Sequence, residues 1–295
     1  MAPNVRSAPN AGKELRHNIR CSLSVEIHSD DPILATDALT RKYGELTAVR
    51  ALSIALRPGE VFGLLGPNGA GKTTVIKMLT TLLPPTSGSA NVAGFDIVRQ
   101  PGRVRRVIGY VPQLLSADGG LSARENLLLF ARLYDIPRAE REPRIRDALA
   151  FMDLEEVQER LVRTYSGGMI RRLEIGQSML HRPRLLFLDE PTVGLDPVAR
   201  HAVWERIGKV RQEYGTTILL TTHYMDEAEH LCDRVAFMNL GEVTAIGTPA
   251  ELKGSIGTGG ATLDDVFEHY TGGMPEEGGT FGDTVRTRRN ARRLG

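Results

Sequence analysis

Gly66-Pro67-Asn68-Gly69-Ala70-Gly71-Lys72-Thr73 is the segment that says most about how this chain folds. It fits the pattern G-x-x-x-x-G-K-[ST], follows the apolar run Val61–Leu65 and opens a helical pattern from about Gly71 to Leu82. Glycines let a backbone fold tightly around phosphates, and free N–H groups at the start of the next helix bind the anion. The alternative is a glycine-rich turn with an incidental lysine, which needs neither the strand nor the helix. We therefore predict nucleotide binding, without choosing among nucleotide hydrolases.

The side chains of this loop have separate predicted tasks. Lys72 is expected to reach the β- and γ-phosphates, and the Thr73 hydroxyl to ligate Mg²⁺. The residues predicted to bind the nucleotide are Gly66, Pro67, Asn68, Gly69, Ala70, Gly71, Lys72, Thr73 and Thr74.

A second apolar run, Leu185–Leu188, ends in the two carboxylates Asp189 and Glu190. Ligands of open α/β sheets bind at the carboxyl ends of the strands, so these acids are expected beside the phosphate loop. Asp189 is predicted to hold Mg²⁺ through water, and Glu190 to orient and polarise the attacking water. A solvated turn is the alternative for this pair, and the nearby phosphate loop disfavours it.

Strand and helix patterns alternate outward from these two motifs, which predicts an α/β domain with a mainly parallel sheet. The stretch between Ser116 and Ser178 is mostly helical, so we expect a helical subdomain at about 116–180 inserted into the sheet domain. The predicted strands are Leu46–Leu56, Val61–Leu65, Ile108–Val111, Leu185–Leu188 and Thr217–Thr221. The predicted helices include Ser122–Tyr134, opened by a capping box of Ser122 and Glu125, then Arg144–Phe151, a helix after Ser166, and Pro197–Tyr214.

Composition narrows the class of protein. The 295 residues allow one α/β domain with tails, and the formal net charge of +1 gives no general attraction to nucleic acid. The two cysteines, Cys21 and Cys232, lack metal-ligand spacing and favour a reducing compartment. No run of 18 apolar residues occurs, so we expect any work at a membrane to depend on docking to another protein.

Both ends of the chain differ from its middle. Residues 1–32 are polar and predict a flexible extension, and residues 255–295 predict an amphipathic helix followed by a disordered basic tail. Leu263, Val266, Phe267 and Tyr270 fall at helical spacing, with Thr262 and Asp265 as a cap. The tail arginines allow contact with anionic lipid or a partner, whereas a solvated tail is the simpler interpretation.

Tyr165-Ser166-Gly167-Gly168-Met169 resembles the signature motif of the ABC family of ATPases. The resemblance implies that Ser166, Gly167 and Gly168 bind the γ-phosphate of ATP held on an opposite subunit, through a helix N-terminus. The common motif begins with Leu and ends with Gln, so Tyr165 and Met169 depart from it, while the phosphate-binding residues are kept. This variant resembles the exporters of the daunorubicin-resistance and nodulation-factor type.

Four further positions resemble functional residues of the same family. Gln113 resembles the glutamine that touches Mg²⁺ and water and couples to the permease, and His223 the histidine that contacts the γ-phosphate. Asp196 resembles the acid of the loop before the next helix, and Tyr43 the aromatic residue that stacks on adenine. Taken singly, they could be a loop amide, a core or surface imidazole, a turn acid and a packed tyrosine.

The resemblance covers roughly residues 33–254 and implies the whole fold class. This is an α/β P-loop NTPase with a RecA-like sheet core, an inserted helical subdomain and a small antiparallel β part. It also implies an ATP-hydrolysing transporter subunit, with ATP and Mg²⁺ as cofactors, that pairs head-to-tail on ATP as a homodimer or paired cassette. It would power a separate permease from the cytoplasmic face of the membrane, most simply as an exporter of drug-like or other small hydrophobic molecules.

Other functions remain open on the sequence. The cassette could serve an importer, or export ions, lipid or polysaccharide, because the cargo site belongs to the permease. An ABC ATPase of DNA repair, chromosome structure or translation usually carries two cassettes, long coiled coils or zinc-binding cysteines, and none is visible here. A nucleotide-binding switch without hydrolysis is disfavoured by Lys72, Asp189, Glu190 and His223.

Overall fold

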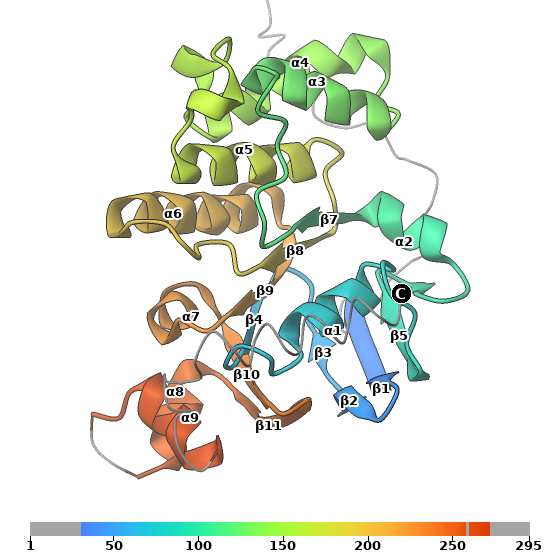
Figure 1. Ribbon diagram of the computed structural model, residues 1–295, viewed down its shortest axis with the longest axis vertical. Coiled ribbons are helices and arrows are strands. Elements are labelled where there is room, and N and C mark those ends of the chain that lie inside the picture. Colours follow the sequence, from blue (N-terminus) through green and yellow to red (C-terminus); the bar gives the residue numbers. More distant parts are fainter. Residues whose placement is uncertain (1–30, 258–259, 272–295) are drawn as a thin grey trace, which may run out of the picture.

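The computed structural model describes residues 31–257 and 260–271, and a six-stranded sheet forms its centre (Figure 1). The strand order is β11-β10-β4-β9-β8-β7, and all neighbours are parallel except β10 and β11. The bounds are β4 (Val61–Leu65), β7 (Ile108–Val111), β8 (Leu185–Asp189), β9 (Thr217–Thr222), β10 (Arg234–Asn239) and β11 (Glu242–Gly247). Because β4 and β8 both pair with β9, the phosphate loop and the two acids reach the same edge of the sheet. The predicted, mainly parallel sheet is confirmed.

A second, antiparallel sheet lies beside the first. Its order is β2-β1-β5-β6, with β3 also paired to β1. The strands are β1 (Leu34–Tyr43), β2 (Leu46–Leu52), β3 (Ala55–Leu56), β5 (Ser87–Val92) and β6 (Phe95–Asp96). The prediction of one strand over Leu46–Leu56 is wrong, because the Thr36 hydroxyl interrupts the ladder. It donates to Leu52 O and accepts from the backbone N–H of Ile54.

The helices are α1 (Lys72–Leu79), α2 (Pro101–Val107), α3 (Ala123–Leu133), α4 (Arg138–Phe151), α5 (Gly167–Met179), α6 (Pro197–Tyr214), α7 (Met225–Leu231), α8 (Pro249–Ser255) and α9 (Leu263–Thr271). The capping box of Ser122 and Glu125 is confirmed. Two predicted boundaries are wrong. Helix α1 ends at Leu79 rather than Leu82, since Thr81 takes a φ of 63°. Helix α4 begins at Arg138 rather than Arg144, with Pro143 inside it, where proline usually ends a helix.

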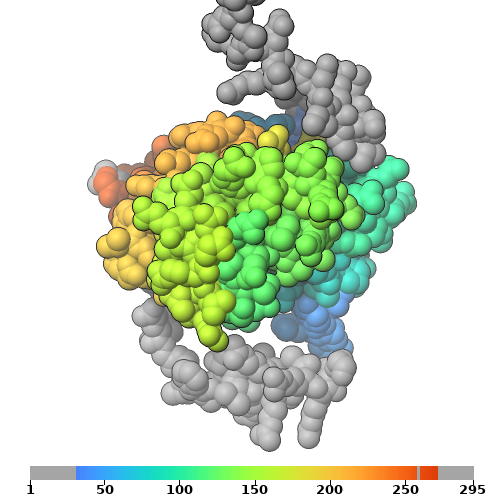
Figure 2. Space-filling view, turned by 90° about the horizontal axis from the view of Figure 1, so that it is seen from above, coloured from blue at the N-terminus to red at the C-terminus, as the bar shows by residue number. Residues whose placement is uncertain are grey.

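The helices α3, α4 and α5 gather at one end of the molecule, and α8 and α9 lie at the other (Figure 1). Figure 2 shows the segment around α3 and α4 covering the end face, in green, with the residues before β7 in cyan at its side. Helix α5 lies close against β7, because a Cβ atom on Gly109 would come within 2.7 Å of Ser178 O. Glycine at this position therefore permits the contact between the helical segment and the sheet.

The C-terminal helix α9 forms as predicted and packs on the sheet domain. Val266 and Phe267 are buried, and the Phe267 ring lies 5.5 Å from the Phe237 ring. Thr262 and Asp265 exchange the expected capping hydrogen bonds. The predictions for residues 1–30, which include Cys21, and for 272–295 lie outside the described residues, whereas Cys232 is buried. Every helix within 31–257 and 260–271 is too short or too polar to cross a membrane.

Candidate nucleotide site

The loop Gly66–Gly71 connects β4 to α1 and takes a backbone path that requires glycine. Gly69 and Gly71 have φ values of 85° and 106°, in the left-handed region. A Cβ atom on Gly71 would also lie 2.4 Å from Ala48 O of strand β2. The small antiparallel sheet therefore supports the loop from one side, and α1 presents its N-terminus on the other. Backbone of this shape can bind an anion.

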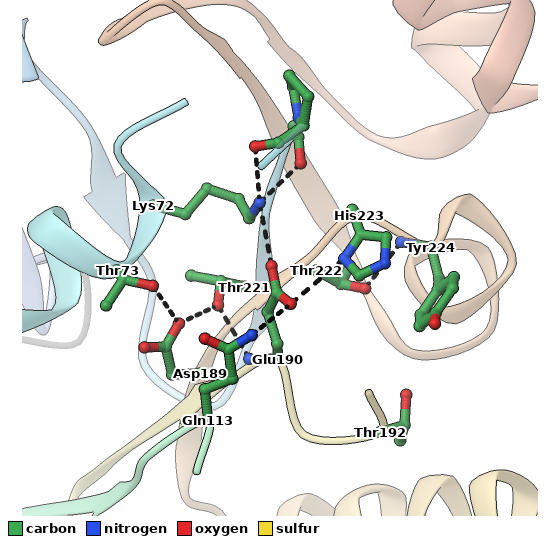
Figure 3. Close-up of polar contacts among 12 residues, drawn as sticks. Lys72, Thr73, Gln113, Asp189, Glu190, Thr192, Thr221, Thr222, His223 and Tyr224 are labelled. Atoms are coloured by element: carbon green, nitrogen blue, oxygen red, sulfur yellow. Dashed lines mark hydrogen bonds and ion pairs between the residues drawn. The ribbon is translucent and has the colours of Figure 1, made fainter. Parts of the chain in front are cut away.

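Lys72, the first residue of α1, lies buried beneath the loop and is 4% exposed. Its Nζ donates to Gly66 O at 2.7 Å and Pro67 O at 3.1 Å, and lies 3.2 Å from Glu190 Oε1 (Figure 3). Burial lowers the pKa of Lys72, and the attraction of Glu190 offsets only part of that effect. The Lys72 ammonium is thus held beside the loop by three oxygen atoms, and a bound phosphate could replace them as its partners.

Glu190, which follows β8, contacts side chains from α1 and from the segments after β7 and β9. Its Oε2 accepts from Gln113 Nε2 at 3.2 Å and lies 3.3 Å from His223 Nδ1, while Oε1 faces Lys72 (Figure 3). Burial raises the pKa of Glu190, but His223 and Lys72 together lower it further, so the pKa lies below its ordinary value. The carboxylate is therefore ionised near neutral pH and can accept a hydrogen bond from water.

The backbone at Glu190 supports this position. Its φ of 49° lies in the left-handed region, which costs a residue with a side chain about 1–3 kcal/mol. The Glu190 N–H donates to Thr221 Oγ1 at 3.0 Å, at the end of the neighbouring strand β9. Strain of this kind persists where the surroundings determine the conformation, and it often marks functional sites.

Asp189 has different hydrogen-bond partners from Glu190, and both are hydroxyl groups. Its Oδ1 accepts from Thr73 Oγ1 at 3.1 Å and Thr221 Oγ1 at 2.7 Å. Burial raises the pKa of Asp189, and the two hydroxyl donors counteract that rise. Within the described residues, no group of three or more His, Cys, Asp and Glu side chains could hold a metal ion by itself. One carboxylate with a hydroxyl does fit Mg²⁺, which usually takes its other ligands from substrate phosphates and water.

The remaining predicted residues lie apart from this cluster. Ser166 caps α5 and accepts from the N–H of Met169 at 3.3 Å, and Asp196 caps α6. Tyr43, at the end of β1, is exposed beneath the guanidinium of Arg41 at 4.6 Å. Within 31–257 and 260–271, no hydrogen bond or ion pair joins Tyr43, Asp196 or Ser166–Gly168 to the phosphate loop. Among the predicted side chains, the described part of the chain thus brings together Lys72, Thr73, Gln113, Asp189, Glu190 and His223 beside the loop.

The structure adds residues that the sequence did not single out. Thr221 bonds both Asp189 and the backbone of Glu190, and a polar pair ending an apolar strand was the available signal. Arg171 and Glu174, two charges on α5, contact the segment that carries Gln113. An i, i+3 charge pair on a helix is usually solvent-exposed, so their burial had no clear sign in the sequence.

Comparisons with known proteins show the family to which this chain is similar. The family model described as ABC transporter matches residues 49–193. The daunorubicin/doxorubicin resistance ATP-binding protein DrrA of Streptomyces peucetius is 46% identical over 225 residues, which are 76% of this chain and 68% of that protein. The Nod factor export ATP-binding protein I of Ralstonia nicotianae is 44% identical over 75% of this chain and 68% of that protein. The dimeric, post-hydrolysis ATP-binding cassette MJ0796 bound to ADP and Pi is similar with a TM-score of 0.65 and 25% identity, over 73% of this chain and 98% of that chain.

Proposed function

The chain belongs to the ATP-binding subunits of ABC transporters. We propose how its residues bind ATP, pair with a second cassette and drive a permease. The membership confirms the predicted family, the P-loop fold with its helical segment, and the ATPase activity. ATP is therefore the nucleotide that the phosphate loop binds.

Glu190 is the residue on which the proposed mechanism rests. It is an ionised, buried carboxylate that contacts Lys72, Gln113 and His223 together. When ATP enters, the phosphates take the donors of Lys72 that now face Gly66, Pro67 and Glu190. Glu190 is then free to accept a proton from the attacking water, while Gln113 orients that water and His223 contacts the γ-phosphate.

The cation site belongs to the same proposal. Thr73 and Asp189, with Gln113, would hold Mg²⁺ between the phosphate loop and β8, where it neutralises charge on the phosphates. The Thr221 hydroxyl keeps the Asp189 carboxylate oriented through the bond at 2.7 Å. Tyr43 is proposed to stack on adenine, which its exposure at the end of β1 permits.

A second copy or a related cassette is needed to complete the site. Ser166 is exposed at the start of α5, and within the described residues its hydroxyl bonds only the N–H of Met169 and no group of the phosphate loop. We infer that Ser166, Gly167 and Gly168 bind the γ-phosphate of ATP held on the opposite chain, with Asp196 at the same boundary. The dimeric form of the similar cassette supports this arrangement.

The permease is proposed to be a separate chain. Leu114 and Leu115, which follow Gln113, are 81% and 48% exposed, and large apolar side chains so placed favour a protein contact. The chain would then sit peripherally at the cytoplasmic face of the membrane. The names of the two relatives support export of drug-like or other small hydrophobic molecules.

The test is ATP hydrolysis by the purified chain over a range of protein concentrations. We expect turnover per chain to rise with concentration, and Glu190→Gln to lower it by about 10²–10⁴ while ATP still binds. The control is Glu205→Gln, an exposed position on α6. Turnover independent of concentration would contradict the pair, and near-normal turnover in Glu190→Gln would move the base elsewhere. Co-expression with the permease is expected to raise turnover further.

A further inference from the structure

Two charged residues in the middle of α5 are buried outside the nucleotide site. Arg171 is 2% exposed and Glu174 is 3% exposed, and they form an ion pair with Arg171 Nη1 3.1 Å from Glu174 Oε2. Removing two charges from water is costly, and an apolar pair of the same volume is often at least as stable. Packing alone therefore does not account for two buried charges at these positions.

Arg171 directs its guanidinium at the backbone that carries Gln113. Nη1 donates to Pro112 O at 2.7 Å and Nη2 to Gln113 O at 2.8 Å. The planar guanidinium can satisfy both carbonyls at once, because its N–H donors form a rigid fork. A lysine has the same charge but donates from a single atom. The contact thus depends on arginine and not only on charge.

Glu174 holds the same segment one step further along. Its Oε1 accepts from the backbone N–H and the hydroxyl of Ser116 and from the N–H of Ala117, the last at 3.2 Å. The two side chains together fix the segment Pro112–Ala117 by backbone groups at both of its ends. Gln113, which donates to Glu190, lies within this fixed segment.

The N-terminal end of α5 is formed by the signature residues Ser166, Gly167 and Gly168. Gly167 and Gly168 allow close packing there, because Cβ atoms on them would lie 3.0 Å from Leu195 Cδ2 and 2.8 Å from Ala199 Cβ. Arg171 follows Ser166 by five residues, which is about 7.5 Å along a helix. A single rigid helix therefore connects the proposed contact with the opposite chain's ATP to the segment that carries Gln113.

We propose that Arg171 and Glu174 are positioning residues that bind the Gln113 segment to α5, so that Gln113 follows the signature end of the helix. Engagement of Ser166 by a second cassette then sets the position of the Gln113 amide relative to Glu190. This inference rests on the functions proposed above for Gln113 and Ser166. It assigns to α5 the coupling between the two halves of the composite site.

Kinetics in two backgrounds test the inference. Arg171→Lys and Glu174→Gln are each made in the wild-type chain and in Gln113→Ala, and Glu174→Gln acts by turning an amide N–H donor towards Arg171 where the paired oxygen now lies. We expect kcat to fall about 10- to 100-fold with KM for ATP unchanged in the wild-type background, because small displacements of catalytic groups cost this much. In Gln113→Ala the same substitutions are expected to cause no further fall. The matched control is Arg206→Lys, a buried arginine of α6 that binds Phe151 O and Asp153 instead.

Hydrogen exchange provides a readout that does not depend on activity. The amides of Ser116 and Ala117 should exchange faster in Arg171→Lys and Glu174→Gln than in the wild type or Arg206→Lys. Unchanged exchange, equal falls of kcat in both backgrounds, or an equal fall in Arg206→Lys would overturn the inference. If Arg171→Lys does not fold, Glu174→Gln decides the result. An inactive wild-type chain, or an unaffected Gln113→Ala, would contradict the proposed function, and the exchange would still test the contact.

Discussion

The phosphate-loop end and the signature end are both helix N-termini with glycines, yet they are built very differently. At the first, Lys72, Asp189 and Glu190 are each less than 5% exposed and bonded to one another or to neighbouring strands. At the second, Ser166 is exposed and its hydroxyl accepts a hydrogen bond from the N–H of Met169. One end is completed by its own chain, and the other presents its donors outward.

This difference shows what each end can do alone. The buried end can bind and orient a nucleotide within one chain, since its charges are already paired and its backbone strain is already present. Ser166, Gly167 and Gly168 carry no ionisable side chain, so in the proposed pair they would contribute a hydroxyl, backbone donors and the helix dipole to a phosphate brought by another chain. In the proposed pair, a single chain would therefore carry two unlike halves of two sites.

Lys72→Ala is expected to weaken ATP binding at the buried end. It removes a charge-assisted contact with the phosphates, worth about 1.5–3 kcal/mol and hence about 10- to 150-fold in ATP affinity. Equilibrium binding of ATP to the chain at low protein concentration measures this loss. The exposed lysine of the same helix, Lys77, provides the control Lys77→Ala. Equal affinity of Lys72→Ala and the wild type would refute the assignment of the loop.

Ser166→Arg is expected to leave that affinity nearly unchanged and to abolish the pair. The long side chain would occupy the space through which the second chain's phosphate approaches, and it also removes the cap of α5. Loss of a cap costs about 0.5–2 kcal/mol, so Thr248→Arg, which removes the cap of α8, controls for this effect. Light scattering with ATP bound to Glu190→Gln chains measures the pair. A dimer that persists in Ser166→Arg would contradict the composite site.

The sequence predicted the buried end well because its chemistry is local. The phosphate loop follows one strand and the two acids end another, and ligand sites of open α/β sheets lie at the carboxyl ends of the strands. The predicted strands β4 and β7 and helix α6 have the observed bounds. The strand break after Leu52 escaped prediction, since it depends on the hydroxyl of Thr36 from a different strand.

The contacts between distant segments could not be predicted in the same way. Gln113 and His223 were assigned from a family resemblance, and only the fold brings their side chains to Glu190. The burial of Arg171 and Glu174 depends on how closely α5 approaches β7 at Gly109, which no local pattern specifies. Long-range packing therefore decides the part of the site that one sequence does not disclose.

Glu227 connects the segment after Glu190 with α6, and its substitution is expected to have the smallest effect of those considered. It is fully buried in α7, and its Oε1 accepts from Thr192 Oγ1 at 2.7 Å and Trp204 Nε1 at 2.8 Å. Thr192 lies just after Glu190, and Trp204 lies on α6, whose first turn packs against the signature glycines. Glutamine can accept both hydrogen bonds, so we expect Glu227→Gln to leave ATP affinity unchanged.

The pH dependence of stability is where Glu227→Gln should differ from the wild type. Burial raises the pKa of Glu227 above its ordinary value of 4.5. The folded chain then keeps this proton at pH values where the unfolded chain has lost it, so the stability contribution is present below pH 4.5 and is lost as the pH rises through the folded pKa. The melting temperature of the variant relative to the wild type should therefore increase between pH 5 and pH 8. A difference that stays constant or shrinks over that range would show that Glu227 is charged in the fold, and that an ionised carboxylate holds the two ends together.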